Sequence, residues 1–220
     1  MTSPRSAVYG DAQSGAAKRA PQARSTEVSE HIRLAAVRLF CERGYHGTSM
    51  RDLAIAVHLE PASLYYHFAT KQQILFDVFR RTMEDLLEGV QRVLVDGMDA
   101  RQQLVAVVRF HVGFHVERQH EAFVSHSELR SLEPVQREAI VALRDRYQAI
   151  LCRVLLSGVT QGHFVIGDVR LTATAILTLT SGVADWFGPK GRLKGEQIAL
   201  QYVGLVLRMV QSAPASAHCG

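Results

Sequence analysis

Thr48–Lys71, which reads TSMRDLAIAVHLEPASLYYHFATK, decides the fold of this chain. Ser49 and Asp52 form a capping-box pattern, so a helix should begin there. The buried face of that helix should come from three apolar residues at helical spacing: Leu53, Ala54 and Val57. Pro61 suits the first turn of a second helix, because its missing N–H costs nothing there. The stretch predicts two short helices joined by a tight turn, as in a helix-turn-helix.

Polar side chains crowd the second of these helices. Leu64 and Phe68 lie four residues apart and should point inward, which turns Ser63, Tyr66 and His67 outward. Short polar groups can approach base edges, and longer ones can donate to phosphate oxygens. We therefore expect this helix to enter the major groove of DNA while the preceding helix braces it.

Helical patterns extend on both sides of this stretch. A first helix should run from near Glu27 to Gly44, and a long helix should run from the Thr70–Gln73 capping box towards Val95. Further helices are expected over five ranges: 99–117, 120–130, 134–161, 168–187 and 196–211. No stretch alternates convincingly at the period of a strand. The expected fold class is all-α, with about nine helices: a three-helix head joined by a continuous helix to a larger helical body.

The same pass divides the chain into four parts. Residues 27–72 form the helix-turn-helix domain, residues 73–212 form the body, and residues 213–220 form a flexible tail. Residues 1–26 are rich in small and polar residues and should be a disordered arm. Three of the four basic residues of that arm lie close to the head: Lys18, Arg19 and Arg24. The residues from 27 to 75 are balanced in charge, so we hypothesise that the arm adds contacts to DNA phosphates.

Composition narrows the class of protein. The 220 residues carry a net charge of +4, and the three cysteines, Cys41, Cys152 and Cys219, lie far apart. That pattern argues against a disulfide framework or a cysteine zinc site and fits a reducing cytoplasm. No window holds the roughly 18 apolar residues that a membrane helix requires, and the first residues lack the apolar core of a signal peptide. We expect a cytoplasmic protein that does not associate with membranes.

The run FCERGYHGTSMRDLA…LYYHFATKQQIL resembles the N-terminal domain of the TetR family of bacterial transcriptional regulators. The match is continuous from Arg33 to Leu75. It implies a ligand-responsive, dimeric repressor that leaves a palindromic operator when a small molecule binds the body. Position by position, it implies DNA contact by nine residues: Thr48, Arg51, Pro61, Ala62, Ser63, Tyr65, Tyr66, His67 and Lys71.

Two positions depart from the family pattern. His58 stands where the family usually has the turn glycine, a position that favours a left-handed backbone, and histidine tolerates that conformation better than most residues. Glu60 replaces the usual serine or threonine cap of the recognition helix. A carboxylate suits a helix N-terminus but is unfavourable near phosphate. These departures leave the expected fold intact and concern the pattern of base reading.

A dimer surface is expected because a single head seldom reads enough sequence on its own. The candidate surface comprises the helices at 168–187 and 196–211, where apolar residues alternate with small ones, and the family resemblance implies a four-helix bundle made by two subunits. Cover for the core of a single subunit is the alternative explanation of the same pattern.

The effector is expected to be small and hydrophobic. The closing segment WFGPKGRLKGEQIALQYVGLVLRMV resembles a branch of the family that regulates fatty-acid or sterol catabolism and responds to acyl-CoA. Four arginines of one helix are candidates for pairing with CoA phosphates: Arg137, Arg144, Arg146 and Arg153. Six residues are the candidates for the ligand chamber: Phe110, Phe114, Phe123, Arg144, Tyr147 and Trp186.

The alternative class is a helical enzyme or a metal-binding protein that uses the same chamber. His111 and His115 lie four apart on one helix, a spacing that can bind zinc, and His120 and His126 follow. No carboxylate pattern such as HExxH accompanies them, and no serine or cysteine lies in a nucleophile motif such as GxSxG. The sequence therefore favours a DNA-binding regulator without catalytic residues, cofactor or metal.

Overall fold

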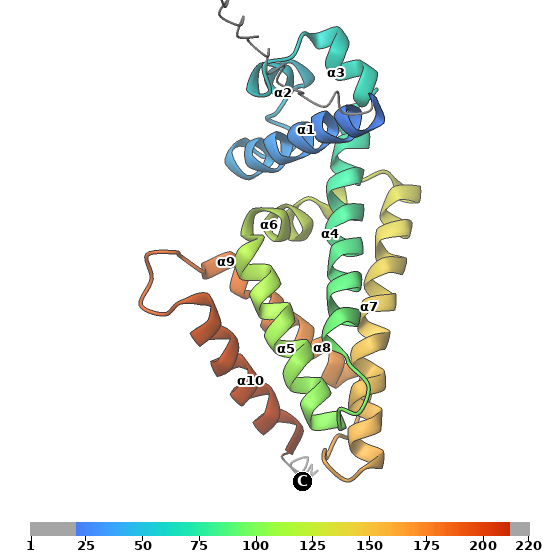
Figure 1. Ribbon diagram of the computed structural model, residues 1–220, viewed down its shortest axis with the longest axis vertical. Coiled ribbons are helices and arrows are strands. Elements are labelled where there is room, and N and C mark those ends of the chain that lie inside the picture. The colour runs from blue at the N-terminus through green and yellow to red at the C-terminus, as the bar shows by residue number, and fades with distance from the viewer. Residues whose placement is uncertain (1–20, 212–220) are drawn as a thin grey trace, which may run out of the picture.

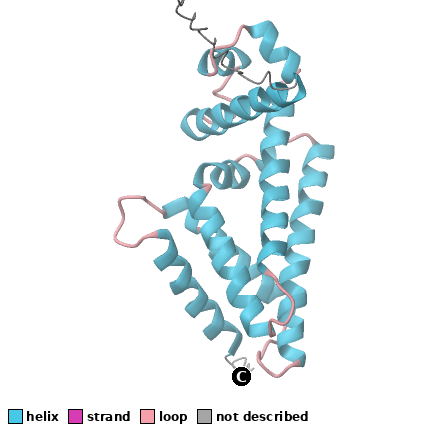
Figure 2. Cartoon of the chain, viewed as in Figure 1, coloured by secondary structure: helices cyan, strands magenta, loops and turns pink. Residues whose placement is uncertain are grey.

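The computed structural model describes residues 21–211, and helices joined by turns and short loops make up this part of the chain (Figures 1 and 2). The head contains α1 (Pro21–Arg43), α2 (Met50–Ala56) and α3 (Pro61–His67). The body contains α4 (Lys71–Val93), α5 (Ala100–Glu117), α6 (Gln119–Ser127), the 3-10 helix η1 (Leu129–Ser131), α7 (Pro134–Thr160), α8 (Val169–Ser181), α9 (Val183–Trp186) and α10 (Gly195–Gln211). The predicted all-α fold is confirmed. None of the described helices is both long and apolar enough to cross a membrane.

The head is a small bundle around fully buried apolar side chains. Phe40 of α1, Leu53 of α2 and Leu64 of α3 are each exposed by 1% or less. The chain leaves α1 through Gly44, which has a φ of +73°. α2 then begins at the predicted capping box, in which Ser49 and Asp52 each bond the backbone of the other. Local caps therefore fix where each short helix starts, and the shared core fixes how they pack.

α4 belongs to both parts of the molecule. It leaves the head beside α1 and continues through the body alongside α7 (Figure 1). Its buried residues form one unbroken stripe, from Ile74 and Leu75 under the head to Leu87 and Val90 in the body. The predicted boundary at residue 72 falls in the first turn of this helix, so the two parts share a rigid element.

Among the remaining helices of the body, α5, α6 and α7 pack against α4. α5, α7 and α8 contact one another, α10 lies along α5, and α6 crosses beneath α1 (Figure 1). Two contacts close the far end of the body. Gly158 allows the Phe164 ring to lie against α7, where an added Cβ would be 1.9 Å from a ring carbon. The Val165 amide donates to the Val210 carbonyl at 2.8 Å.

Three boundaries differ from the sequence-based expectations. α1 begins at Pro21, six residues before the expected start near Glu27, so the predicted arm is too long; residues 1–20 and the predicted tail at 213–220 lie outside the described residues. The expected helix at 120–130 is α6 followed by η1. The expected helix at 168–187 is divided at Gly182 into α8 and α9.

The division at Gly182 and the end of α9 have one local and one long-range cause. The Thr180 hydroxyl donates to the backbone carbonyl of Ile176, a side-chain bond that bends helices. The Gln119 side chain then donates to the carbonyls of Ala184 and Phe187 and so satisfies the end of α9. A residue 65 positions earlier in the chain thus fixes this helix end, which explains why the local pattern did not reveal it.

Candidate DNA interface and effector cavity

The outer surface of the head is formed by α2 and α3, at the end of the molecule remote from α10 (Figure 1). Tyr65 and Tyr66 are 51% and 83% exposed, and Pro61 and Ala62 at the start of α3 are exposed as well. Arg51 is exposed on α2. These five predicted DNA contacts are thus open to a duplex. A large aromatic side chain with a hydroxyl at its tip can donate to phosphate while its ring covers the sugar.

Ser63 and His67 are partly buried, and His67 has a partner in the head. Its Nδ1 lies 3.2 Å from the Ser29 hydroxyl of α1. That hydroxyl also donates to the Ser25 carbonyl at 2.9 Å, so in this arrangement His67 Nδ1 is the donor to Ser29. The bond anchors the last turn of α3 to α1 and sets the direction of the imidazole.

The two departures from the family pattern occupy the turn between α2 and α3. His58 has a φ of +54°, the left-handed conformation expected at the turn position. Glu60 is the N-cap of α3, but its side chain makes no capping bond, and it is exposed. Its carboxylate therefore lies free near the end of the helix that faces DNA.

Thr48 and Lys71 are predicted DNA contacts that the structure places in the packing of the head instead. Thr48 is 1% exposed, and its hydroxyl donates to the carbonyls of Leu39 and Gly44. The Lys71 ammonium donates to the carbonyls of Tyr45 and Thr48 at 2.7 and 2.6 Å, and it lies 4.2 Å from the centre of the Tyr45 ring. Partial burial lowers the pKa of Lys71. For the Thr48 side chain the prediction is wrong, and the bonds of Lys71 hold the turn after α1.

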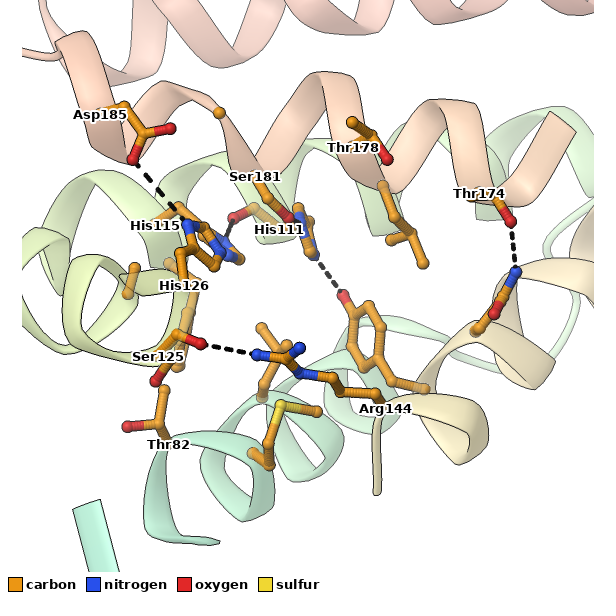
Figure 3. Close-up of a pocket in the computed structure, with 18 residues that line it drawn as sticks. Thr82, His111, His115, Ser125, His126, Arg144, Thr174, Thr178, Ser181 and Asp185 are labelled. Atoms are coloured by element: carbon orange, nitrogen blue, oxygen red, sulfur yellow. Dashed lines mark hydrogen bonds and ion pairs between the residues drawn. The ribbon is translucent and has the colours of Figure 1, made fainter. Parts of the chain in front are cut away.

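A cavity of about 560 Å³ lies in the body, between α4, α5, α6, α7, α8 and α9 (Figure 3). Its apolar lining comprises Met83, Leu86, Phe114, Ala122 and Leu177. Twelve of the lining residues have polar side chains: Thr82, His111, His115, Ser125, His126, Arg144, Tyr147, Gln148, Thr174, Thr178, Ser181 and Asp185. The volume falls within the range of small-molecule sites.

Hydrogen bonds orient the histidines of the cavity. His111 lies 2.9 Å from both the Tyr147 and the Ser181 hydroxyl groups. His115 Nδ1 lies 2.8 Å from the His111 carbonyl, which only accepts, so this nitrogen carries the proton. Burial lowers the pKa of His115 to about 4 and holds that of His111 well below its usual value. Both rings are therefore neutral at pH 7, which leaves His115 Nε2 as an acceptor.

Three of the six residues predicted for the ligand chamber line this cavity. Phe114, Arg144 and Tyr147 line the cavity. Phe110 does not, because its ring lies against Gly89 of α4. Phe123 and Trp186 are 40% and 57% exposed and lie outside it. Aromatic content was therefore a poor guide to this site.

The residues that the sequence reasoning missed are mostly small and polar. Thr174, Thr178 and Ser181 follow one face of α8 at helical spacing, and Ser125 and His126 lie at the end of α6. Two histidines on the buried face of α5 gave a usable signal, since His111 and His115 interrupt an otherwise apolar stripe. Polar groups on a buried face point to a lined cavity as readily as to a metal site.

The metal-binding alternative has no support in the described part of the chain. No group of three or more histidine, cysteine or acidic side chains there is arranged to hold a metal ion. His111 uses both ring nitrogens for hydroxyl partners, and His120 is exposed on α6, away from the cavity. The spacing of the histidines reflects the cavity lining.

Comparison with known proteins identifies both parts of the chain. Residues 32–78 match the family described as bacterial regulatory proteins, tetR family, and residues 97–210 match the tetracyclin repressor-like C-terminal domain. The HTH-type transcriptional repressor KstR2 of Rhodococcus jostii is 31% identical over 176 residues, which are 78% of this chain and 85% of that protein. The fatty acid metabolism regulator protein of Bacillus subtilis is 27% identical, over 69% of this chain and 79% of that protein.

A solved structure extends the likeness to a liganded complex. The crystal structure of AibR in complex with isovaleryl coenzyme A and operator DNA has a TM-score of 0.75 and 30% sequence identity, and the match covers 81% of this chain and 97% of that one. The matched families span the head and the body described above. The chain belongs to the TetR family of bacterial regulatory proteins and is a ligand-responsive, DNA-binding repressor.

Proposed function

We propose that this repressor binds a palindromic operator as a homodimer and is released when an acyl-CoA thioester or a similar hydrophobic effector occupies the cavity. AibR, the relative solved with isovaleryl coenzyme A and operator DNA, supports this class of effector. Because such a repressor acts on the bacterial chromosome, we place it in the cytoplasm.

The observation that carries the proposal is the position of α6. One side of this helix lines the cavity through Ala122, Ser125 and His126. The same helix contacts α1 of the head, in addition to α4, α5, α9 and η1 of the body. A ligand that displaces α6 therefore acts directly on the surface beneath the DNA-binding helices.

Three hydrogen bonds join the region around α6 and η1 to the head. The Cys41 thiol of α1 donates to the His120 carbonyl at 3.4 Å. The Glu128 carboxylate accepts from the Tyr45 amide at 3.1 Å. The Gln72 side chain donates to the Ser131 carbonyl at 2.6 Å. These bonds connect the cavity wall to the start of α4 and to the turn that Lys71 holds, which is a contiguous route for coupling.

The dimer surface that we propose is the outer face of α8 and α10. Some of the residues predicted for it, including Ile176, Ile198 and Val206, are buried in the core of the subunit. Other residues of these two helices form an apolar surface that stays exposed in the described part of the chain: Leu171, Leu179, Leu200, Leu205 and Met209, each between 38% and 66% exposed. Exposed apolar residues gathered on two adjoining helices are typical of an interface.

The arginines of α7 divide into two groups. Arg137, Arg146 and Arg153 are exposed, whereas Arg144 lines the cavity. The exposed three therefore have no contact with a ligand inside the cavity, and only a portion that extends outside it can reach them. Of the four arginines predicted to pair with CoA phosphates, only Arg144 can therefore contact the part of a ligand that enters the cavity.

Fluorescence anisotropy with DNA selected from genomic fragments tests the proposal. We expect the protein to bind such DNA and to release it as acyl-CoA thioesters are added, with free CoA as the control. Sedimentation should show a dimer that Leu171→Asp or Leu205→Asp converts to a monomer. Retention of DNA in the presence of every acyl-CoA, with release by an unrelated effector, would contradict the proposed effector class.

A further inference from the structure

One end of the cavity carries a cation that has no acidic partner in the described part of the chain. Arg144 extends from α7 across the cavity towards α6 (Figure 3). Its Nη2 donates to the Ser125 backbone carbonyl at 2.7 Å, a neutral acceptor. Burial alone lowers its pKa, and no carboxylate among the described residues offsets that effect. A guanidinium has five N–H donors, so most of them remain available to a ligand.

Asp185, the one acidic residue among the described residues of the lining, does not compensate Arg144. Its carboxylate lies 3.9 Å from His126 Nδ1, and it is 60% exposed on α9. In Figure 3 it lies on the opposite side of the cavity from Arg144, beyond the histidines. The charge of Arg144 therefore remains open to an anion inside the cavity.

Ser125 supplies a second unused donor at the same end. Its side chain lines the cavity and the residue is 6% exposed, yet its Oγ has no hydrogen-bond partner among the described residues. A buried hydroxyl without a partner is unfavourable, and an acceptor brought by a ligand removes that penalty. Since Arg144 donates to the backbone carbonyl of this same residue, its guanidinium lies close to Ser125.

We infer that the effector carries a carboxylate on the portion that enters the cavity, and that Arg144 and Ser125 bind it. The inference rests on the proposed acyl-thioester function and specifies its acyl group: a dicarboxylic acyl chain in place of a plain hydrocarbon chain. Arginine and carboxylate form paired, charge-assisted hydrogen bonds, and a partly buried cation gains most from a ligand that neutralises it. A plain alkyl chain would leave both donors unpaired.

Three thioesters of equal chain length test the inference: octanoyl-CoA, 7-oxooctanoyl-CoA and suberoyl-CoA, the last with a terminal carboxylate. Calorimetric titration of the full chain should show suberoyl-CoA binding at least about tenfold more tightly than octanoyl-CoA, the gain expected from a charge-assisted bond. The neutral 7-oxo compound should fall between them. An equal gain from the oxo compound would overturn the requirement for an acid.

Two matched variants on α7 locate the effect. Arg144→Met keeps the length of the side chain and should abolish the preference for suberoyl-CoA. Arg146→Met, which removes an exposed arginine two residues away, should leave it intact. Ser125→Ala should reduce the preference by a smaller factor. If Arg144→Met weakened all three thioesters equally, Arg144 would bind the CoA portion and the inference would fail.

The outcomes for the wild-type chain separate this inference from the proposed function. Equal affinity for octanoyl-CoA and suberoyl-CoA contradicts the carboxylate and leaves the acyl-CoA function standing. Absence of binding by all three, in a chain that still binds DNA, contradicts the effector class itself. These measurements need no variant, so they remain decisive if Arg144→Met fails to fold.

Discussion

The head and the body of this protein present their recognition groups in opposite ways. The head places Tyr65 and Tyr66 on an exposed helix, over a small closed core. The body buries His111, Ser125 and Tyr147 around an internal cavity. Contacts of the first kind are made in water and respond to salt. Contacts of the second kind depend on fit and on pairing every buried polar group.

The largest effect should follow from loss of packing in the head. Leu64 is fully buried beneath the recognition surface, so Leu64→Ala should lower the free energy of unfolding by about 2–5 kcal/mol. DNA binding should weaken with it. Ile55→Ala, at a position that is 64% exposed, should change stability by less than about 0.5 kcal/mol. Urea denaturation measures both, and equal losses would show that the head lacks a closed core.

Acidification should affect the body through its neutral histidines. His115 packs against His111 of α5 and His126 of α6, with Asp185 of α9 acting on it from farther away. Its folded pKa of about 4 lies below the usual 6.5, so the unfolded chain binds the proton first. Stability should therefore fall as pH drops from 6.5 towards 4, by up to about 1.4 kcal/mol per pH unit.

Denaturation curves at pH 7 and pH 5 check this expectation. His115→Gln removes the titrating group, so the variant should lose less stability between the two pH values than the unmodified chain. The difference should approach about 2 kcal/mol over the 1.5 units below 6.5. Identical pH dependence in both proteins would mean that His115 is not held neutral by the fold.

Two basic residues of the head should separate structural from electrostatic roles. Lys71→Met removes the charged donor of the Tyr45 and Thr48 carbonyls and should cost about 1–3 kcal/mol of stability. Arg51→Met, at an exposed position, should leave stability unchanged and reduce the salt dependence of DNA binding by about one counterion. If Lys71→Met alone reduced the salt dependence, Lys71 would be the phosphate contact that the resemblance implies.

The smallest effect should lie in the connection between the two regions. Glu128→Ala removes the acceptor of the Tyr45 amide and should leave binding of DNA alone and of effector alone nearly unchanged. The loss of DNA affinity on adding effector should shrink by about 0.5–2 kcal/mol. Glu138→Ala, on the exposed face of α7, is the control. If effector lowered the DNA affinity of Glu128→Ala as much as that of the unmodified chain, the coupling between cavity and head would not depend on the bond between Glu128 and Tyr45.

Local chemistry made the head predictable from the sequence. Ser49, Asp52, Thr70 and Pro61 act within three residues of their own positions, and the structure places them at the helix starts where they were expected. The helical spacing of apolar residues likewise identified the long helices. These features need no knowledge of what lies across the fold.

Side chains whose partners lie far away in the sequence could not be placed by the same reasoning. Lys71 finds its acceptors 23 and 26 residues earlier, and Thr48 is covered by the end of α1. In the body, Trp186 was chosen for its size, but its position follows from the bend at Gly182. The shape of a cavity depends on how several helices pack against one another. The residue pattern of a single helix does not contain that information.

The continuity of α4 has a mechanical consequence. Its 23 residues make a rod of about 34 Å that starts under the head and ends deep in the body. Pivoting such a rod by about 6° about its body end would move its head end through about 3.5 Å, which is close to the rise of one base pair. A shift in the cavity wall that tilted α4 in this way would therefore be magnified at the head.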